Sequence, residues 1–195
     1  PADLIEVNVR EEEGSLLIRT GGEAPPASET RRRHITTGAG KSGTDFRFIN
    51  AARQIQPIQS QVQFTATHLL EMIDLLQQRS ATFVLTGGVH SAALADQDGM
   101  ICMFEDIGRH NAVDKVLGYA FLHGISSQDK ILLLSGRIAS EILLKAARAQ
   151  IPLVLSRSAP TGLTIDLAEE LNITVVGFAR GKRLSVYTHP ERVLL

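Results

Sequence analysis

Short apolar runs alternate with longer amphipathic segments in the C-terminal half of the chain, and this rhythm constrains the fold more than any other feature. The runs at 130–134, 153–155 and 173–176 are typical of buried strands, whereas 139–149 and 161–171 repeat apolar residues at helical spacing. Strands that are apolar along their whole length need cover on both faces. The pattern therefore predicts an α/β fold, a three-layer α/β/α sandwich.

The same rules predict the elements that precede this region. Thr65 is a suitable N-cap for the first helix, in which Leu69, Ile73 and Leu76 recur at helical spacing. In chain order we expect a helix over 65–78, a strand over 83–85, a short helix over 90–94, a strand over 100–104, a helix over 111–122 and, after the region above, a last strand over 184–187.

The N-terminal part of the chain differs in composition. Alternating apolar residues predict strands over 4–9 and 15–19, joined by a turn at Glu13-Gly14, and residues 21–45 have the glycine, proline and arginine content of a long flexible loop. Two strands cannot bury enough surface to be stable alone. We therefore divide the chain into residues 1–60, a remnant β appendage plus flexible loop, and residues 61–195, the α/β domain.

The overall composition excludes several classes of protein. Twenty basic and 21 acidic residues give a net charge of −1, which does not favour a nucleic-acid partner. No apolar run approaches the roughly 18 residues of a membrane span, and no signal peptide is visible, so we expect a cytoplasmic protein. Cys102 is the only cysteine, which excludes an internal disulfide. A start at Pro1 fits a truncated N-terminus.

Arginine follows three of the predicted strands, at Arg137, Arg157 and Arg180. Ligands of such sheets bind beyond the carboxyl ends of the strands. The backbone N–H groups at a helix start attract phosphate, and arginine adds a bidentate donor. Each arginine could instead cap a carbonyl or pair with an acid. Their equivalent positions favour a phosphate or nucleotide site.

The run from Glu105 to Asn111 is the densest polar segment. Asp106 is placed to cap the following helix, and Gly108 to supply an unusual backbone angle. These structural roles leave Arg109 and His110 unexplained. His110 could carry a proton or donate to phosphate, or it could be structural, and the sequence leaves both roles open.

His90 follows Gly87-Gly88 where the prediction places a strand-to-helix turn, the place at which zinc deaminases carry His-x-Glu. Here Ala92 occupies the position of the general acid or base, and no later helix begins with cysteines. The three protein ligands that a zinc site needs are absent, so we predict no metal, although a deaminase-like frame stays open. Cys102, in an apolar run, is expected to be inert.

Residues 38–42, Gly-Ala-Gly-Lys-Ser, are similar to part of a phosphate-binding P-loop. The full pattern needs a further glycine where this chain has Ile35, and a helix directly after the serine. Residues 43–45 are poor helix formers. We therefore predict that this segment is not a P-loop.

Four motifs in their order and spacing resemble the FdhD family of formate dehydrogenase accessory proteins. They are residues 87–92 (Gly-Gly-Val-His-Ser-Ala), residues 105–115 (Glu-Asp-Ile-Gly-Arg-His-Asn-Ala-Val-Asp-Lys), residues 135–141 (Ser-Gly-Arg, then Ser-Glu) and residues 158–161 (Ser-Ala-Pro-Thr) with 177–180 (Gly-Phe-Ala-Arg). The eleven-residue run is the most specific of them, and together the motifs span about 110 residues.

The resemblance implies a cytidine-deaminase-like α/β core that binds the bis-molybdopterin guanine dinucleotide cofactor. It also implies two protein partners, a cysteine desulfurase and formate dehydrogenase. In that family, a Cys-x-x-Cys pair in a flexible loop relays sulfur from the desulfurase to the cofactor before the cofactor enters formate dehydrogenase.

The matching loop of this chain has Ala39 and Ser42 at the positions of those catalytic cysteines. Neither residue can form a persulfide, because sulfur relay depends on thiolate chemistry. Whether the chain is an enzyme therefore stays open. One hypothesis is a sulfurtransferase of the FdhD type, another is a non-catalytic chaperone that binds the cofactor and hands it over, and a third, a nucleotide-modifying enzyme, lacks its metal ligands.

The predicted cofactor site combines the strand-end residues with positions from the family motifs. We expect it to hold the guanine nucleotide moiety of the cofactor, with neither nucleic acid nor membrane as a partner. We also expect a homodimer, although the apolar residues Val113, Val116 and Leu117 could equally belong to the core. The predicted cofactor-binding residues are His90, Arg109, His110, Gly136, Arg137, Arg157, Ser158, Thr161, Phe178 and Arg180.

Overall fold

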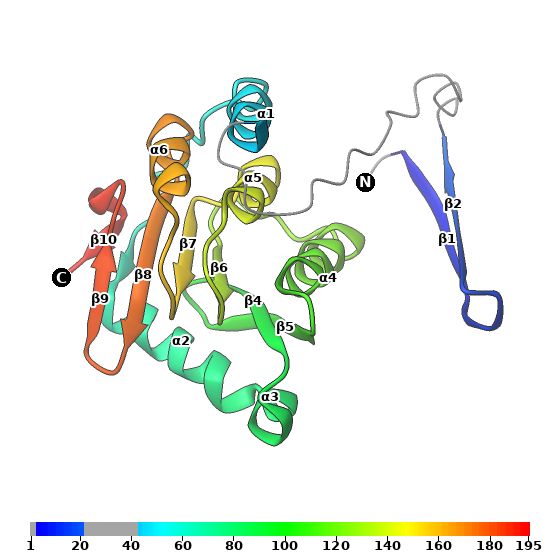
Figure 1. Cartoon of the computed structure of the whole chain (residues 1–195), viewed down its shortest axis with the longest axis horizontal. Helices are drawn as coiled ribbons and strands as arrows, with labels where there is room; N and C mark the ends of the chain where they lie inside the picture. Colours follow the sequence, from blue (N-terminus) through cyan, green and yellow to red (C-terminus); the bar gives the residue numbers. More distant parts are fainter. Residues whose placement is uncertain (1–2, 22–42) are drawn as a thin grey trace. The chain divides into compact units, whose positions relative to one another are not determined.

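A computed structural model describes residues 3–21 and 43–195 of the protein (Figure 1). The chain divides into two compact units, residues 1–39 and 40–195. The sequence-based boundary at residue 60 differs from this division, because helix α1 (Gly43–Ala52) packs against helices of the larger unit. The positions of Ala39 and Ser42 lie outside the described residues.

The smaller unit contains the predicted hairpin. Strands β1 (Leu4–Arg10) and β2 (Ser15–Thr20) pair antiparallel, and the turn uses Gly14 in the left-handed conformation at φ 59°. Register pairs such as Val7 with Ile18 place aliphatic side chains on one face of the hairpin, and these side chains are exposed.

The larger unit is built on a six-stranded sheet. Its central strands β6, β7 and β8 are parallel, as their continuous apolar sequences predict, whereas β4, β5 and β9 run antiparallel to their neighbours. The strand order is β5 (Met100–Asp106), β4 (His90–Ala95), β6 (Ile131–Leu134), β7 (Leu153–Ser156), β8 (Thr174–Arg180) and β9 (Arg183–Val186).

Helices cover both faces of this sheet, which confirms the three-layer α/β/α prediction. Helix α2 (Ala66–Arg79), capped by Thr65 as predicted, packs on one face. The other face carries α4 (Arg109–Leu122), α5 (Ser140–Arg148) and α6 (Gly162–Glu170), with α1 outside α5 and α6 (Figure 1). None of the helices among the described residues is long and apolar enough to cross a membrane.

Two cores result from the alternation of side chains along the strands. In β4, Ala92 and Leu94 contribute to the core under α4–α6, and Ala93 and Ala95 to the core under α2. In α4, Val116 and its neighbour Val113 are fully buried in the first of these cores. Their apolar character is therefore explained by the core.

The structure corrects two predicted elements. Residues 83–85 lie in a short helix, α3 (Ala81–Thr86), and residues 90–94 form a strand. The alanine-rich sequence of β4 favours a helix locally, but β4 is buried on both faces between β5 and β6, and this tertiary context overrides the propensity. Because both edges of β4 are already paired with β5 and β6, residues 83–85 have no strand edge of β4 to pair with.

The start of α1 at Gly43 is a third correction, because residues 43–45 were judged poor helix formers. Packing of the later turns of α1 against α5 and α6 compensates for weak intrinsic propensity. The argument against a P-loop now depends on Ile35 alone, in the position that requires glycine. Residues 35–42 lie outside the described part of the chain.

Candidate functional site

The predicted polar clusters meet at one edge of the sheet. Strands β5, β6, β7 and β8 all end there, and β4 begins there because it runs antiparallel to β5 and β6. His90 pairs in register with Asp106, and the amide of Ser135 donates to the carbonyl of Ser91 at 3.0 Å. His90 therefore reaches the predicted edge from the start of a strand, and the comparison with a deaminase helix start is wrong.

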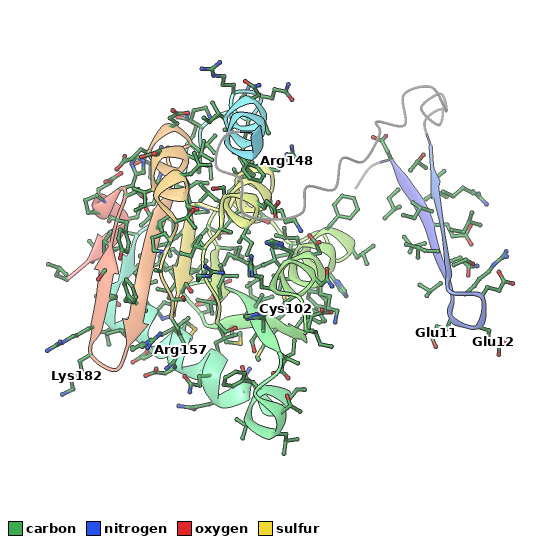
Figure 2. The ribbon with its side chains drawn as sticks, in the orientation of Figure 1. Glu11, Glu12, Cys102, Arg148, Arg157 and Lys182 are labelled. Atoms are coloured by element: carbon green, nitrogen blue, oxygen red, sulfur yellow. The ribbon has the colours of Figure 1, made fainter. Side chains whose placement is uncertain are left out.

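A pocket of about 430 Å³ lies at this edge on the α2 side of the sheet. The strand ends contribute polar and basic side chains, and α2, α3 and the glycine turn contribute the opposite wall. Figure 2 shows Arg157 at this edge, close to α2. The lining residues are His90, Ser91, Ser135, Arg157 and Arg180 from the strand ends, and Leu76, Gln77, Ser80, Phe83, Gly87, Gly88 and Val89 from the opposite wall.

The end of β7 is fixed by a short hydrogen-bond network. The hydroxyl of Ser156 donates to the carbonyl of Gly136 at 2.6 Å and accepts from the amide of Ser158 at 3.0 Å. Between them, the amide of Arg157 donates to the carbonyl of Leu134 at 3.3 Å. These bonds join the ends of β6 and β7, so the backbone that carries Arg157 is held in place. Ser158 itself acts through its backbone here.

A bulge in β8 brings Arg180 to Arg157. The register between β8 and β9 shifts between Gly177 and Arg180, and Phe178 adopts φ 50°, a left-handed angle that is uncommon for a residue other than glycine. A Cβ at Gly177 would lie 3.0 Å from the carbonyl oxygen of Ser158, so a larger residue would require the backbone there to shift. After the bulge, the Nε of Arg180 donates to the carbonyl of Arg157 at 2.9 Å.

His90 packs directly on Gly136. A Cβ at Gly136 would lie 3.0 Å from Nδ1 of the His90 ring, so the glycine makes room for the imidazole. The amide of Ser91, the next residue, donates to the hydroxyl of Ser135 at 2.9 Å. The arrangement places an imidazole and two arginine side chains around one pocket, which suits an anionic ligand such as a phosphate.

The β5–α4 turn is held by Asp106. Its Oδ1 accepts from the amide of Gly108 at 2.8 Å and from Nδ2 of Asn111 at 3.1 Å, and its Oδ2 lies 2.8 Å from Nζ of Lys115. Lys115 and these hydrogen bonds lower the pKa of Asp106 to about 2. Asp106 therefore stabilises the turn before the helix, whose N-cap is Gly108.

Gly108 does not have the unusual backbone angle that the sequence led us to expect. Its φ is −94°, an ordinary extended value. A Cβ at this position would lie 3.1 Å from Nδ2 of Asn111, so a larger residue would displace this side chain slightly.

Arg109 and His110 begin α4, on the other face of the sheet, and do not line the pocket. Nε2 of His110 lies 3.3 Å from Oε2 of Glu141, within ion-pair distance, but the geometry is not that of a hydrogen bond. Burial lowers the pKa of His110, and the Glu141 carboxylate only partly opposes this effect. His110 Nε2 and Arg109 Nε are both buried, and neither has a hydrogen-bond partner among the described residues.

The remaining predicted residues are dispersed along the edge. Arg137 is exposed and is not among the residues that line the pocket, and Phe178 is 48% exposed. The hydroxyl of Thr161 accepts from the amide of Thr164 at 3.3 Å as the N-cap of α6, which is a structural role.

Sequence reasoning missed Ser91, Ser135 and Phe83 as pocket residues. Ser135 could have been predicted as a site residue, because it directly follows an apolar strand. Phe83 had none, since residues 83–85 were predicted to form a strand.

The fold and the pocket together define a class of protein, a three-layer α/β protein whose sheet edge carries a pocket lined by basic and hydroxyl side chains. The model of the FdhD/NarQ family matches residues 1–194, and the chain belongs to this family.

Individual relatives agree with this assignment. The chain is 42% identical to the sulfur carrier protein FdhD of Halalkalibacterium halodurans, over 98% of this chain and 72% of the relative. It is 40% identical to the protein of the same name from Geobacillus kaustophilus, over 100% and 74%. A crystal structure assigned as a formate dehydrogenase accessory protein from Desulfotalea psychrophila superimposes with a TM-score of 0.78 at 27% identity, covering 98% of this chain and 72% of that one.

Proposed function

We propose that this protein supports the maturation of formate dehydrogenase by binding the bis-molybdopterin guanine dinucleotide cofactor at the pocket beside β6–β8. The observation that carries the proposal is the convergence of Arg157 and Arg180 on one pocket, where Nε of Arg180 donates to the backbone carbonyl of Arg157 at 2.9 Å. Two guanidinium groups that line one pocket can bind a diphosphate, with His90 and the serine hydroxyls as further donors.

The size of the pocket limits how much of the cofactor it can hold. A volume of about 430 Å³ lies in the lower part of the range for small-molecule sites, about 300–1,000 Å³, and fits one guanine nucleotide moiety rather than the whole dinucleotide cofactor. The cofactor is cargo in this proposal. Formate dehydrogenase would receive the cofactor in the cytoplasm. The family resemblance also leads us to expect a cysteine desulfurase and a second copy of this chain as partners. The resemblance of the α/β domain to the cytidine-deaminase-like fold is part of the same proposal.

Relay of sulfur from a desulfurase is the activity that the family implies, but this chain lacks the thiols for it. Ala39 and Ser42 hold the relay positions, and the one remaining thiol, Cys102, lies in β5 with a pKa that burial raises. A raised pKa reduces the thiolate that would have to attack sulfur. These residues favour the second candidate function, a chaperone that binds the cofactor and hands it over without relaying sulfur.

Calorimetric titration with GDP tests the binding proposal, since GDP stands in for one end of the cofactor. We expect the wild-type protein to bind GDP, and Arg157→Ala and Arg180→Ala each to weaken binding by at least about tenfold. Arg148→Ala, an exposed arginine at the end of α5 remote from Arg157 in Figure 2, is the matched control and should bind normally. Equal affinity for GDP in all four proteins would refute the site.

Arg137→Ala adds a comparison between the sequence-based and the structure-based site. Because Arg137 is exposed and does not line the pocket, we expect a smaller loss of affinity than for Arg157→Ala.

Transfer of labelled sulfur from a desulfurase then separates the two candidate functions. Measurable transfer through this chain would contradict the chaperone hypothesis.

A further inference from the structure

Helix α3, one wall of the pocket, is attached to the protein unusually weakly. None of its six residues is buried, and Phe83, Val84 and Leu85 are 42%, 72% and 85% exposed although all three are apolar. The segment ends at Gly87, which adopts φ 65°, and continues into Gly88. Phe83 nevertheless faces the pocket. A wall without buried side chains, followed by two glycines, can move without disturbing either core.

Glu105 of β5 holds the first backbone amides of this helix, and the residue before the helix, Ser80, shares a 2.7 Å hydrogen bond between hydroxyl groups with Ser91 of β4. Oε2 of Glu105, in β5, accepts from the amide of Thr82 at 3.1 Å, and Oε1 accepts from the amide of Phe83 at 3.2 Å. The other hydrogen bonds found in residues 82–88 are local, such as that from the Gly88 amide to the hydroxyl of Thr86.

Glu105 is itself well anchored. The hydroxyl of Ser91 lies 3.5 Å from Oε1, and Nζ of Lys115 donates to the carbonyl of Glu105 at 3.0 Å. Lys115 also pairs with Asp106, so the end of β5 is fixed to α4. The backbone of Glu105 is therefore fixed, and its carboxylate reaches the start of α3 from this fixed strand end.

We propose that Glu105 is a positioning residue that latches α3 as a movable lid over the pocket. When the two hydrogen bonds are made, Phe83 closes the wall opposite Arg157. When they break, α3 swings away about Gly87-Gly88 and opens the pocket. The latch is a property of the unliganded protein, whereas its role in retaining a nucleotide rests on the proposed function.

Amide hydrogen exchange of the unliganded protein tests the latch first. We expect Glu105→Ala to accelerate exchange at residues 82–88 by about tenfold or more, and Glu105→Gln, which keeps one carbonyl acceptor, to have an intermediate effect. Glu169→Ala is the matched control, because Glu169 is an exposed acid near the end of α6 that pairs only with His189 among the described residues. Unchanged exchange at residues 82–88 in Glu105→Ala would overturn the latch.

Rapid-mixing measurements of GDP dissociation then test the lid. We expect Glu105→Ala to release GDP about tenfold faster with an unchanged circular dichroism spectrum. Accelerated exchange together with wild-type GDP dissociation would overturn the lid, because α3 would then move without controlling the ligand. If the wild-type protein failed to bind GDP, the proposed function would fail separately, and the exchange rates would still decide for or against the latch.

Discussion

Replacement of Arg192 should destabilise the α/β unit more than replacement of any exposed arginine. Arg192 ends the 3-10 helix η3 (Pro190–Arg192) and is 3% exposed. Its Nε and Nη2 donate to the carbonyl of Ser60 at 3.2 and 3.0 Å, Nη2 also donates to Oδ1 of Asn172 at 3.1 Å, and Nη1 donates to the hydroxyl of Thr174 at 3.2 Å. All of these acceptors are neutral. The side chain thus ties the C-terminus to β8 and to the segment before α2.

The magnitude follows from what Arg192→Met would leave behind. Acceptors that lose a charged donor in a buried site cost about 1–3 kcal/mol, and relief from burying the guanidinium offsets part of this. Burial lowers the pKa of Arg192, because it disfavours the charged guanidinium group. A pocket of about 160 Å³ beside Arg192 admits water to the vacated acceptors. We therefore expect a net loss of about 2 kcal/mol in the free energy of unfolding.

Urea unfolding followed by far-ultraviolet circular dichroism measures this loss, since the chain has no tryptophan. Arg148→Met is the control, expected to change stability by less than about 0.5 kcal/mol because Arg148 is exposed. Arg192→Lys should lose nearly as much stability as Arg192→Met, because an ammonium group cannot reproduce the planar set of N–H donors of the guanidinium group. A loss below about 0.5 kcal/mol for Arg192→Met would refute the reasoning.

Three further changes test the site and its supports. Gly177→Ala should lower stability by about 1–3 kcal/mol in thermal unfolding, because its Cβ meets backbone at 3.0 Å. Gly136→Ala should instead weaken GDP binding about fivefold, near 1 kcal/mol, with little loss of stability, because the new methyl displaces the His90 ring. Asp106 has a folded pKa of about 2, below its unfolded value, so its contribution to stability is present above about pH 4 and is lost as the pH falls towards 2. The stability difference between wild type and Asp106→Asn should therefore shrink over that interval, and a difference independent of pH would contradict the role of Lys115 and its neighbours.

The sequence predicted the layers of the fold because burial on both faces leaves a direct trace in the strands. Residues 131–134 and 153–155 are apolar throughout, and each became a parallel strand. The same rule could not predict that residues 83–85 are helical and that residues 90–94 form a strand. The small alanine side chains of β4 contribute to the cores on both faces of the sheet. Considered without this tertiary context, the same alanines favour a helix.

The sequence could predict those residues of the candidate site that directly follow a strand. Arg157 and Arg180 follow apolar strands, and the structure brings both to one pocket, but Arg137 follows a strand equally directly and remains outside it. The bulge at Phe178 accounts for the placement of Arg180, and the amide of Phe178 donates to the carbonyl of Ser158, 20 positions earlier in the chain, which a local sequence pattern does not reveal. Glu105 was visible in a motif, yet its partners at residues 82 and 83 are 23 and 22 positions away.

The pocket residues and the positions that the family resemblance assigns to sulfur relay lie in different parts of the sequence. Among the described residues, those that line the pocket belong to the segment from Leu76 to Arg180, whereas the resemblance assigns relay to the positions of Ala39 and Ser42. Gly136, Gly177 and Ser156 hold the basic strand ends from within the sheet. The proposal of cofactor binding therefore rests on the sheet edge alone, and its test does not depend on whether sulfur is relayed.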